Sequence, residues 1–234
     1  MLAPECKVAG AVAFVLVVVA TPREALWAYG IYAGLVVLLA TMARVGVRTL
    51  VRRLVIETPF LLFVVGLPFL AGGERVDVAG VGLSIEGLWA AWNILVKATV
   101  GAATMVLLAS TTPITTILEG LQRLKLPPVM VAIAGFMVRY FDVIVSEMRR
   151  MKIGRESRGY DARWWWRAKA LSASAGTLFI RSYERGERVH LAMLSRAYTG
   201  SMPEFSPRAG SLSQWAAAAT LPATALAVCV WAWL

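Results

Sequence analysis

The chain has 234 residues, of which 59% are hydrophobic and only 16% are charged. Soluble globular proteins are about 45–50% apolar and about 25% charged, so this composition argues against an ordinary soluble domain and against a disordered chain. The net charge is nevertheless +10, from 24 Lys and Arg against 14 Asp and Glu. A very apolar chain with a large basic excess is typical of a membrane protein with basic cytoplasmic segments, and not of a nucleic-acid binder.

Five apolar segments are predicted to span a membrane, each near the ~20 residues that a bilayer requires. They are residues 8–21, 26–43, 54–71, 87–110 and 212–234. The loop after the second segment carries Arg44, Arg48, Arg52 and Arg53 without an acid, whereas the next loop has a net charge of −2. The positive-inside rule therefore predicts a multi-pass protein of the cell membrane with a cytoplasmic N-terminus.

Residues 111–211 hold 16 of the 24 basic residues and 8 of the 14 acidic ones. We expect three helices here: a short amphipathic one over 114–124, a long one from Met130 to about Ser157, and a third over 171–195. Residues 130–145 could form a further span, but Arg139 and Asp142 interrupt them, and a span would place the most basic segment outside. We therefore expect this helix to lie along the inner membrane face.

These segments predict an all-α integral membrane protein in three parts. Residues 1–110 form an N-terminal membrane domain of four spans, residues 111–211 form cytoplasmic and interfacial helices, and residues 212–234 form the C-terminal span.

An internal duplication is the most informative pattern in the basic region. Ser157-Arg158-Gly159-Tyr160 recurs 38 residues later as Ser195-Arg196-Ala197-Tyr198, and Gly154 aligns with Ala192 upstream. Each copy places an arginine between small residues at the end of a predicted basic helix. Such an arginine could simply cap the helix, because a cation there complements the helix dipole. It could also be presented to an acidic partner, because a guanidinium binds a carboxylate with two hydrogen bonds.

Catalytic and metal sites are not supported by the residues present. The only cysteines are Cys6 and Cys229, and the only histidine is His190, so zinc, haem and iron–sulfur sites lack ligands. No lysine follows a glycine, so the phosphate-binding loop of P-loop ATPases is absent. We expect no catalytic residues and no cofactor bound by this chain.

Three other features have a structural and a functional interpretation. Lys97 lies within the fourth predicted span and could pair with Glu57, extend to the inner surface or act in transport. The aromatic run Trp164, Trp165 and Trp166 is predicted to anchor an interfacial segment rather than stack on bases. His190 is expected to be a surface or packing residue.

The motifs of the basic region, in order, resemble a known family. They are Thr111-Thr112-Pro113, residues 136–140 (FMVRY), residues 147–151 (EMRRM), the two arginine motifs, and residues 181–188 (RSYERGER). They resemble the transmembrane T component of energy-coupling factor transporters, in its cobalt-type CbiQ branch. The likeness covers essentially the whole chain and is densest over residues 111–200.

The resemblance implies a scaffold that joins two P-loop ATPases, which bind the ATP, to a substrate-binding membrane subunit. In this family two helices end in an X-Arg-X signature, commonly Ala-Arg-Gly, whose arginine docks on an ATPase. Carried over, the docking residues are Ser157, Arg158 and Gly159, and Ser195, Arg196 and Ala197. Serine replaces the first alanine in both motifs, and Ala197 replaces the second glycine. Because alanine disfavours a left-handed backbone, the turn after the third helix is expected to differ.

The resemblance also implies ATP-driven import of Co²⁺, with apolar residues such as Phe136 and Met137 facing the substrate-binding subunit. A T component for nickel or a vitamin is an alternative, because no residue of this sequence identifies the substrate. A self-contained carrier is a second alternative, but it would need more ionisable groups within the spans than Lys97 and Glu57. A membrane-anchored nucleic-acid or lipid-binding protein would not explain the repeated arginines.

Overall fold

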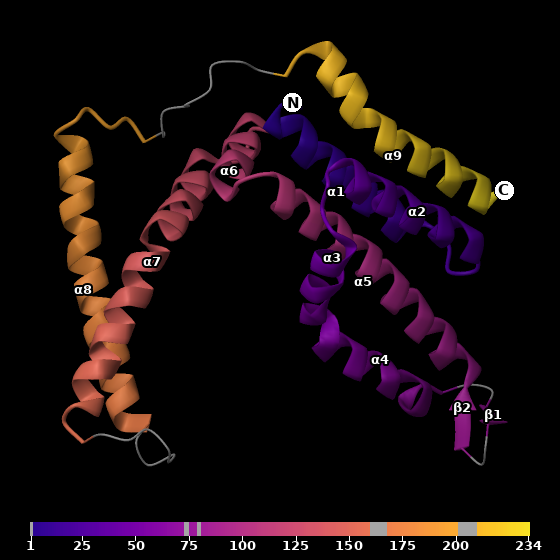
Figure 1. The fold of residues 1–234 in the computed structure, drawn as a ribbon, viewed down its shortest axis with the longest axis horizontal. Helices are drawn as coiled ribbons and strands as arrows, with labels where there is room; N and C mark the ends of the chain where they lie inside the picture. The colour runs from indigo at the N-terminus through magenta and orange to yellow at the C-terminus, as the bar shows by residue number, and fades with distance from the viewer. Residues whose placement is uncertain (1, 73–74, 79–80, 160–167, 201–209) are drawn as a thin grey trace. The chain divides into compact units, whose positions relative to one another are not determined.

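The computed structural model describes residues 2–72, 75–78, 81–159, 168–200 and 210–234 (Figure 1). Its helices are α1 (Pro4–Ala20), α2 (Leu26–Met42), α3 (Val47–Leu54), the 3-10 turn η1 (Val55–Glu57), α4 (Thr58–Leu70), α5 (Ile85–Thr111), α6 (Ile114–Arg123), α7 (Pro128–Glu156), α8 (Ala168–Leu194) and α9 (Leu212–Trp233). Between α4 and α5, β1 (Arg75–Val78) pairs antiparallel with β2 (Val81–Ser84), with Arg75 opposite Ser84. The predicted all-α fold class is confirmed, with this short hairpin as an addition.

The chain forms two compact units. The first comprises Met1–Leu124 with Arg208–Leu234, and the second comprises Lys125–Pro207. In the first unit, α1 packs against α5, α6 and α9, and α2 packs against α5 and α9. Its buried cluster draws on all four of the longer helices, so segments more than 200 residues apart in sequence share one core.

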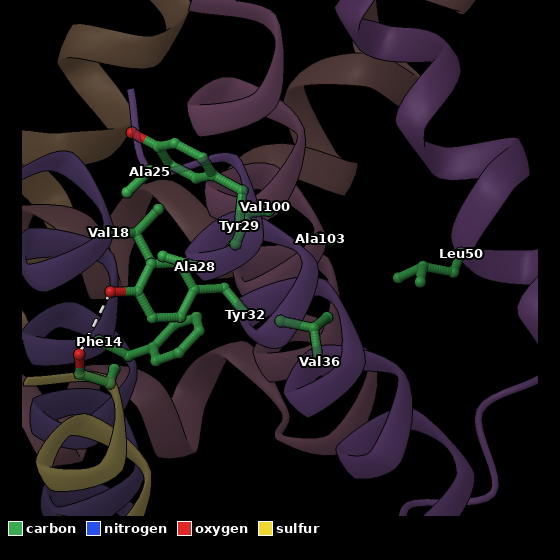
Figure 2. Packing of buried hydrophobic residues seen from close by; sticks show 11 residues of the cluster. Phe14, Val18, Ala25, Ala28, Tyr29, Tyr32, Val36, Leu50, Val100 and Ala103 are labelled. Atoms are coloured by element: carbon green, nitrogen blue, oxygen red, sulfur yellow. Dashed lines mark hydrogen bonds between the residues drawn. The ribbon is translucent and has the colours of Figure 1, made fainter. Parts of the chain in front are cut away.

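Two tyrosines of α2 organise that core (Figure 2). The Tyr32 ring lies edge-on to Phe14, with 5.9 Å between the ring centroids, and neither side chain is exposed. The Tyr32 hydroxyl donates to the carbonyl of Ala225 in α9 at 3.2 Å and shares a 2.9 Å hydrogen bond with the Thr21 hydroxyl. A buried hydroxyl requires such partners, so these bonds connect α1, α2 and α9.

The C-terminal carbonyls of α1 receive hydrogen bonds from three other helices. Lys97 Nζ of α5 donates to the Val19 carbonyl at 2.7 Å, and the Trp233 indole of α9 donates to the Ala20 carbonyl at 3.3 Å. The Tyr29 hydroxyl of α2 donates to the Thr21 carbonyl at 3.1 Å. The last carbonyls of a helix have no partner within it, and a cation there complements the helix dipole. Lys97 therefore caps a helix.

Of the alternatives open for Lys97, the pairing with Glu57 is not the one that the structure shows. One oxygen of the Glu57 carboxylate accepts a 3.1 Å hydrogen bond from the Thr99 hydroxyl, and the other is buried without a partner among the described residues. Lys97 and Thr99 are two residues apart on α5, so they lie on different faces of the helix. The Lys97 ammonium and the Glu57 carboxylate consequently form hydrogen bonds with different neighbours.

The expected spans correspond to helices of unequal length. Only α5, α7 and α9 among the described helices are long and apolar enough to cross a membrane singly. Helices α1 and α2 have 17 residues each. The third expected span, residues 54–71, corresponds to η1 and α4, and α4 meets α3 at a 54° bend. Helix α7 contains an apolar stretch long enough to cross a membrane, although the sequence favoured a position along the membrane face.

Candidate docking site at two helix ends

Both predicted arginine motifs lie at the C-terminal ends of the long helices of the second unit. Ser157 follows the last residue of α7, and Ser195 follows the last residue of α8. The amide of Arg158 donates to the Arg155 carbonyl at 3.1 Å, and that of Arg196 donates to the Met193 carbonyl at 3.0 Å. The described residues of the first copy, 157–159, therefore have the same local structure as residues 195–197 of the second.

The residue after each arginine adopts a left-handed backbone. Gly159 has φ 74° and Ala197 has φ 59°. The Ala197 amide donates to the Leu194 carbonyl and the Tyr198 amide to the Met193 carbonyl, which is the hydrogen-bond pattern of a Schellman cap. The expectation that Ala197 would change the turn is wrong, because these two bonds and the helix end hold an alanine in a conformation that usually favours glycine.

Each serine also makes the same hydrogen bond to the helix that precedes it. The Ser157 hydroxyl donates to the Gly154 carbonyl at 3.2 Å, and the Ser195 hydroxyl donates to the Ala192 carbonyl at 3.0 Å. Gly154 and Ala192 are the two positions that the duplication aligned. Serine at these positions therefore satisfies a terminal carbonyl that an alanine would leave to solvent.

Several other basic residues of the same helices have partners within the second unit. Arg150 and Arg181 both pair with Glu147, Arg155 donates to the Ser174 hydroxyl, and Arg188 lies 4.0 Å from Glu184. Arg158 and Arg196 are exposed, and within the described ranges neither guanidinium has a hydrogen-bond or ion-pair partner. Both forks are therefore available to a carboxylate of another molecule.

The motifs lie at opposite ends of an antiparallel helix pair (Figure 1). Glu147 of α7 contacts Arg181 of α8, and Arg155, nearer the end of α7, contacts Ser174, nearer the start of α8. With 29 and 27 residues, the helices are each about 40 Å long at 1.5 Å per residue. The arginines are thus separated by roughly that distance along the pair.

An apolar groove of about 400 Å³ lies between α7 and α8. Phe136 and Met137 line it, together with Val189 and Met193 from α8. Phe136 is stacked on Tyr140 with 6.3 Å between the rings, whereas Met137 is 67% exposed. The groove brings together two residues predicted to contact the substrate-binding subunit. Trp164, Trp165 and Trp166 lie outside the described residues.

Sequence reasoning missed Glu147 as a site residue. Its side chain, 17% exposed, accepts from Arg150 on its own helix at 2.7 Å and from Arg181 on α8. An acidic residue three positions before an arginine predicts the first bond. The second bond needs the antiparallel pairing, which the sequence does not specify. His190 is exposed and also lines the groove.

Metal ligands do not cluster in the part of the chain that the structure describes. No group of three or more His, Cys, Asp or Glu side chains there could hold an ion. Cys6 and Cys229 are both buried with free thiols.

Residues 2–206 match the family described as CbiQ, cobalt transport protein. The chain belongs to this family. Among its relatives, the CbiQ cobalt transport protein of Rhodobacter capsulatus is 26% identical over 62% of this chain and 62% of its own length. A protein named as a fused cobalt transport protein CbiMQ, from Methanocorpusculum labreanum, is 29% identical over 56% of this chain and 23% of its own length.

An uncharacterised protein of Methanocaldococcus jannaschii is 36% identical over 44% of this chain and 38% of its own length. This CbiQ-family chain therefore aligns with less than two thirds of the length of each of these relatives. Membership of the CbiQ family and the long apolar helices together make it a multi-pass membrane protein.

Proposed function

We propose that this chain is the membrane scaffold and coupling subunit of an ATP-driven importer of the energy-coupling factor type, with Co²⁺ as the substrate. The observation that carries the proposal is the equivalence of the two arginine-bearing helix ends. Each offers one exposed guanidinium, one left-handed residue and one serine bonded back to its helix. Two equal ends fit two ATPase subunits, each docking one of them.

The helix ends would transmit motion because they belong to one paired structure. Closure of two ATPases on ATP would move Arg158 and Arg196 relative to each other. The contacts of Glu147 with Arg181 and of Arg155 with Ser174 oppose the sliding of α7 along α8. Motion of the ends would therefore tilt the pair as a body.

Helix α7 is proposed to lie along the inner membrane face, with its apolar half toward lipid and the substrate-binding subunit. Its length would also allow a span. However, its polar half pairs with α8, which carries charges at every turn from Arg181 to Arg188. A lipid-embedded α7 would bring these charges toward the hydrocarbon region, where each is costly. The N-terminus is proposed to be cytoplasmic.

The substrate-binding subunit is proposed to be a separate or fused membrane protein of the type named CbiM. Support comes from the fused name of the Methanocorpusculum relative and from the apolar groove lined by Phe136 and Met137. Metal recognition is assigned to that subunit, because the described part of this chain has no cluster of metal ligands.

The test is reconstitution of the transporter in cells. Cobalt uptake is expected only when the chain is expressed with a P-loop ATPase and a substrate-binding subunit, and it should stop when the ATPase phosphate-loop lysine is replaced. The purified chain alone should neither hydrolyse ATP nor bind Co²⁺ stoichiometrically in calorimetry. Cobalt uptake by the chain without any ATPase would contradict the proposal and favour a self-contained carrier.

A further inference from the structure

A buried carboxylate near the N-terminus contacts two segments that are distant in sequence. Glu5, in the first turn of α1, is 4% exposed. Its carboxylate accepts hydrogen bonds from Arg123 Nη1, at 3.2 and 3.4 Å, and from the backbone amide of Gly210. The Arg123 side chain is only 10% exposed. We call Glu5, Arg123 and Gly210 the Glu5 anchor.

The backbones around the Glu5 anchor approach too closely for larger residues. A Cβ at Gly120 of α6 would lie 2.9 Å from the Pro4 carbonyl carbon, and one at Gly210 would lie 2.7 Å from Cys6 Sγ. Two glycines thus allow α6 and the segment before α9 to pack on the first turn of α1. Burial alone would raise the pKa of Glu5, but its hydrogen bonds and Arg123 outweigh burial and lower it, so the carboxylate is ionised at neutral pH.

The Glu5 anchor lies where the chain leaves and re-enters the first unit. The second unit comprises Lys125–Pro207, so Arg123 precedes it by two residues and Gly210 follows it by three. Lys125, two residues after the end of α6, has a left-handed backbone with φ 62°, and Pro127 and Pro128 follow. One carboxylate therefore holds both chain connections to the helices that bear the arginine motifs.

We propose that Glu5 is a positioning residue that fixes both connections of the second unit to the first unit, so that movement of α7 and α8 is transmitted to the membrane helices. The coupling part of this inference rests on the proposed function. The anchoring part does not. Without the anchor, α7 and α8 would still dock their ATPases, but their movement would be absorbed by loosened connections rather than passed to α1.

The buried thiol of Cys6 provides a direct readout of the anchor. Cys6 is fully buried against Gly210, and burial raises the pKa of its thiol, so maleimide should react with it slowly. In a Cys229→Ala background Cys6 is the only cysteine. Arg123→Gln leaves the buried Glu5 carboxylate without its ion-pair partner, and Glu5→Gln removes the carboxylate that accepts from Arg123 and Gly210. Each variant should accelerate labelling roughly tenfold, because local opening limits the reaction of a buried thiol.

The double variant Glu5→Gln/Arg123→Gln is the rescue control. It removes both charges of the buried ion pair, and the two amides can still bond to each other and to Gly210, so labelling should return toward the wild-type rate. Glu24→Gln, at an exposed position, is the matched control and should label like wild type. Equal labelling rates in wild type and both single variants, measured on the full chain in membranes, would refute the anchor whatever the protein transports.

Uptake then tests the coupling. In the assembled transporter, the single variants should reduce substrate uptake several-fold while the ATPases still co-purify, and the double variant should recover uptake. Faster Cys6 labelling with unchanged uptake would refute the coupling role. Failure of the wild-type chain to hold any ATPase would refute the proposed function instead, while the labelling experiment would still decide the anchor.

Discussion

Substitutions at the two left-handed residues, Gly159 and Ala197, are predicted to change the stability of their helix caps in opposite directions. Gly159→Ala places a Cβ on a backbone with φ 74°, and Ala197→Gly removes one from a backbone with φ 59°. A left-handed conformation costs a residue with a Cβ about 1–2 kcal/mol. Glycine loses about 0.5–1 kcal/mol more backbone entropy on folding than alanine, which offsets part of this.

The net effect should be about 1 kcal/mol in each case, because backbone conformation is the main term that changes. A Cβ at Gly159 would meet no described atom within 4 Å, so no clash adds to the cost. Gly159→Ala should therefore destabilise the cap of α7, and Ala197→Gly should stabilise the cap of α8. An energy of 1 kcal/mol corresponds to roughly a fivefold change in the equilibrium for opening.

Hydrogen exchange measured by mass spectrometry checks this on the full chain. The informative amide in the second motif is that of Tyr198, which donates to the Met193 carbonyl at 3.1 Å. Peptides covering it should exchange roughly fivefold more slowly in Ala197→Gly, since capping limits their opening. Peptides at the end of α7 should exchange faster in Gly159→Ala. Unchanged or reversed exchange at both ends would show that the left-handed residues do not control the helix ends.

Three further predictions concern the first unit. Lys97→Met should lower the free energy of unfolding by about 1–3 kcal/mol, because the charged hydrogen bond to α1 is lost. In thermal unfolding, the effects of Lys97→Met and Glu57→Gln should add in the double variant to within roughly 0.5 kcal/mol. A larger coupling energy would indicate that Lys97 and Glu57 form an ion pair. A cysteine placed near Arg48 should be labelled only from the cytoplasm and one near Asp77 only from outside, and the reverse pattern would invert the topology. Because the folded-state pKa of Glu5 is lowered below 4.5, its stabilising contribution is present above that pH and lost as the pH falls through the lowered pKa; thermal unfolding measured across this acid range should show the loss in wild type and not in Glu5→Gln.

The sequence predicted the helices well where the hydrophobic pattern and the helix-terminating residues agree. Residues 114–124 between two proline-containing segments became α6, and the long basic helices ended at Glu156 and Leu194, as the duplicated motifs indicated. Membrane placement of α7 is less determined, because an apolar half followed by a basic half satisfies both a span and an interfacial helix. Sequence alone cannot decide this, since the deciding factor is what α8 packs against.

The errors arose where a residue's partner depends on tertiary packing. Charge alone allows Lys97 to pair with Glu57, but the structure bonds it to the Val19 carbonyl at the end of α1. Ala197 was judged by intrinsic preference, but the hydrogen bonds of the cap outweigh it. The role of Glu5 was not predicted either, because Arg123 and Gly210 lie more than 100 residues away in sequence.

We propose that Arg158 and Arg196 are the contacts by which this chain holds its ATPases. Truncating one partner of a desolvated, hydrogen-bonded charge pair typically costs roughly 2–5 kcal/mol, and lysine should rescue poorly because an ammonium lacks the guanidinium fork. The most direct measurement is co-purification of the ATPases with a tagged Arg158→Ala/Arg196→Ala variant, beside Arg149→Ala as an exposed control on α7. We predict that the double variant loses both ATPases while the control retains them. Full retention of the ATPases by the double variant would show that the two arginines are helix caps and contradict the coupling role.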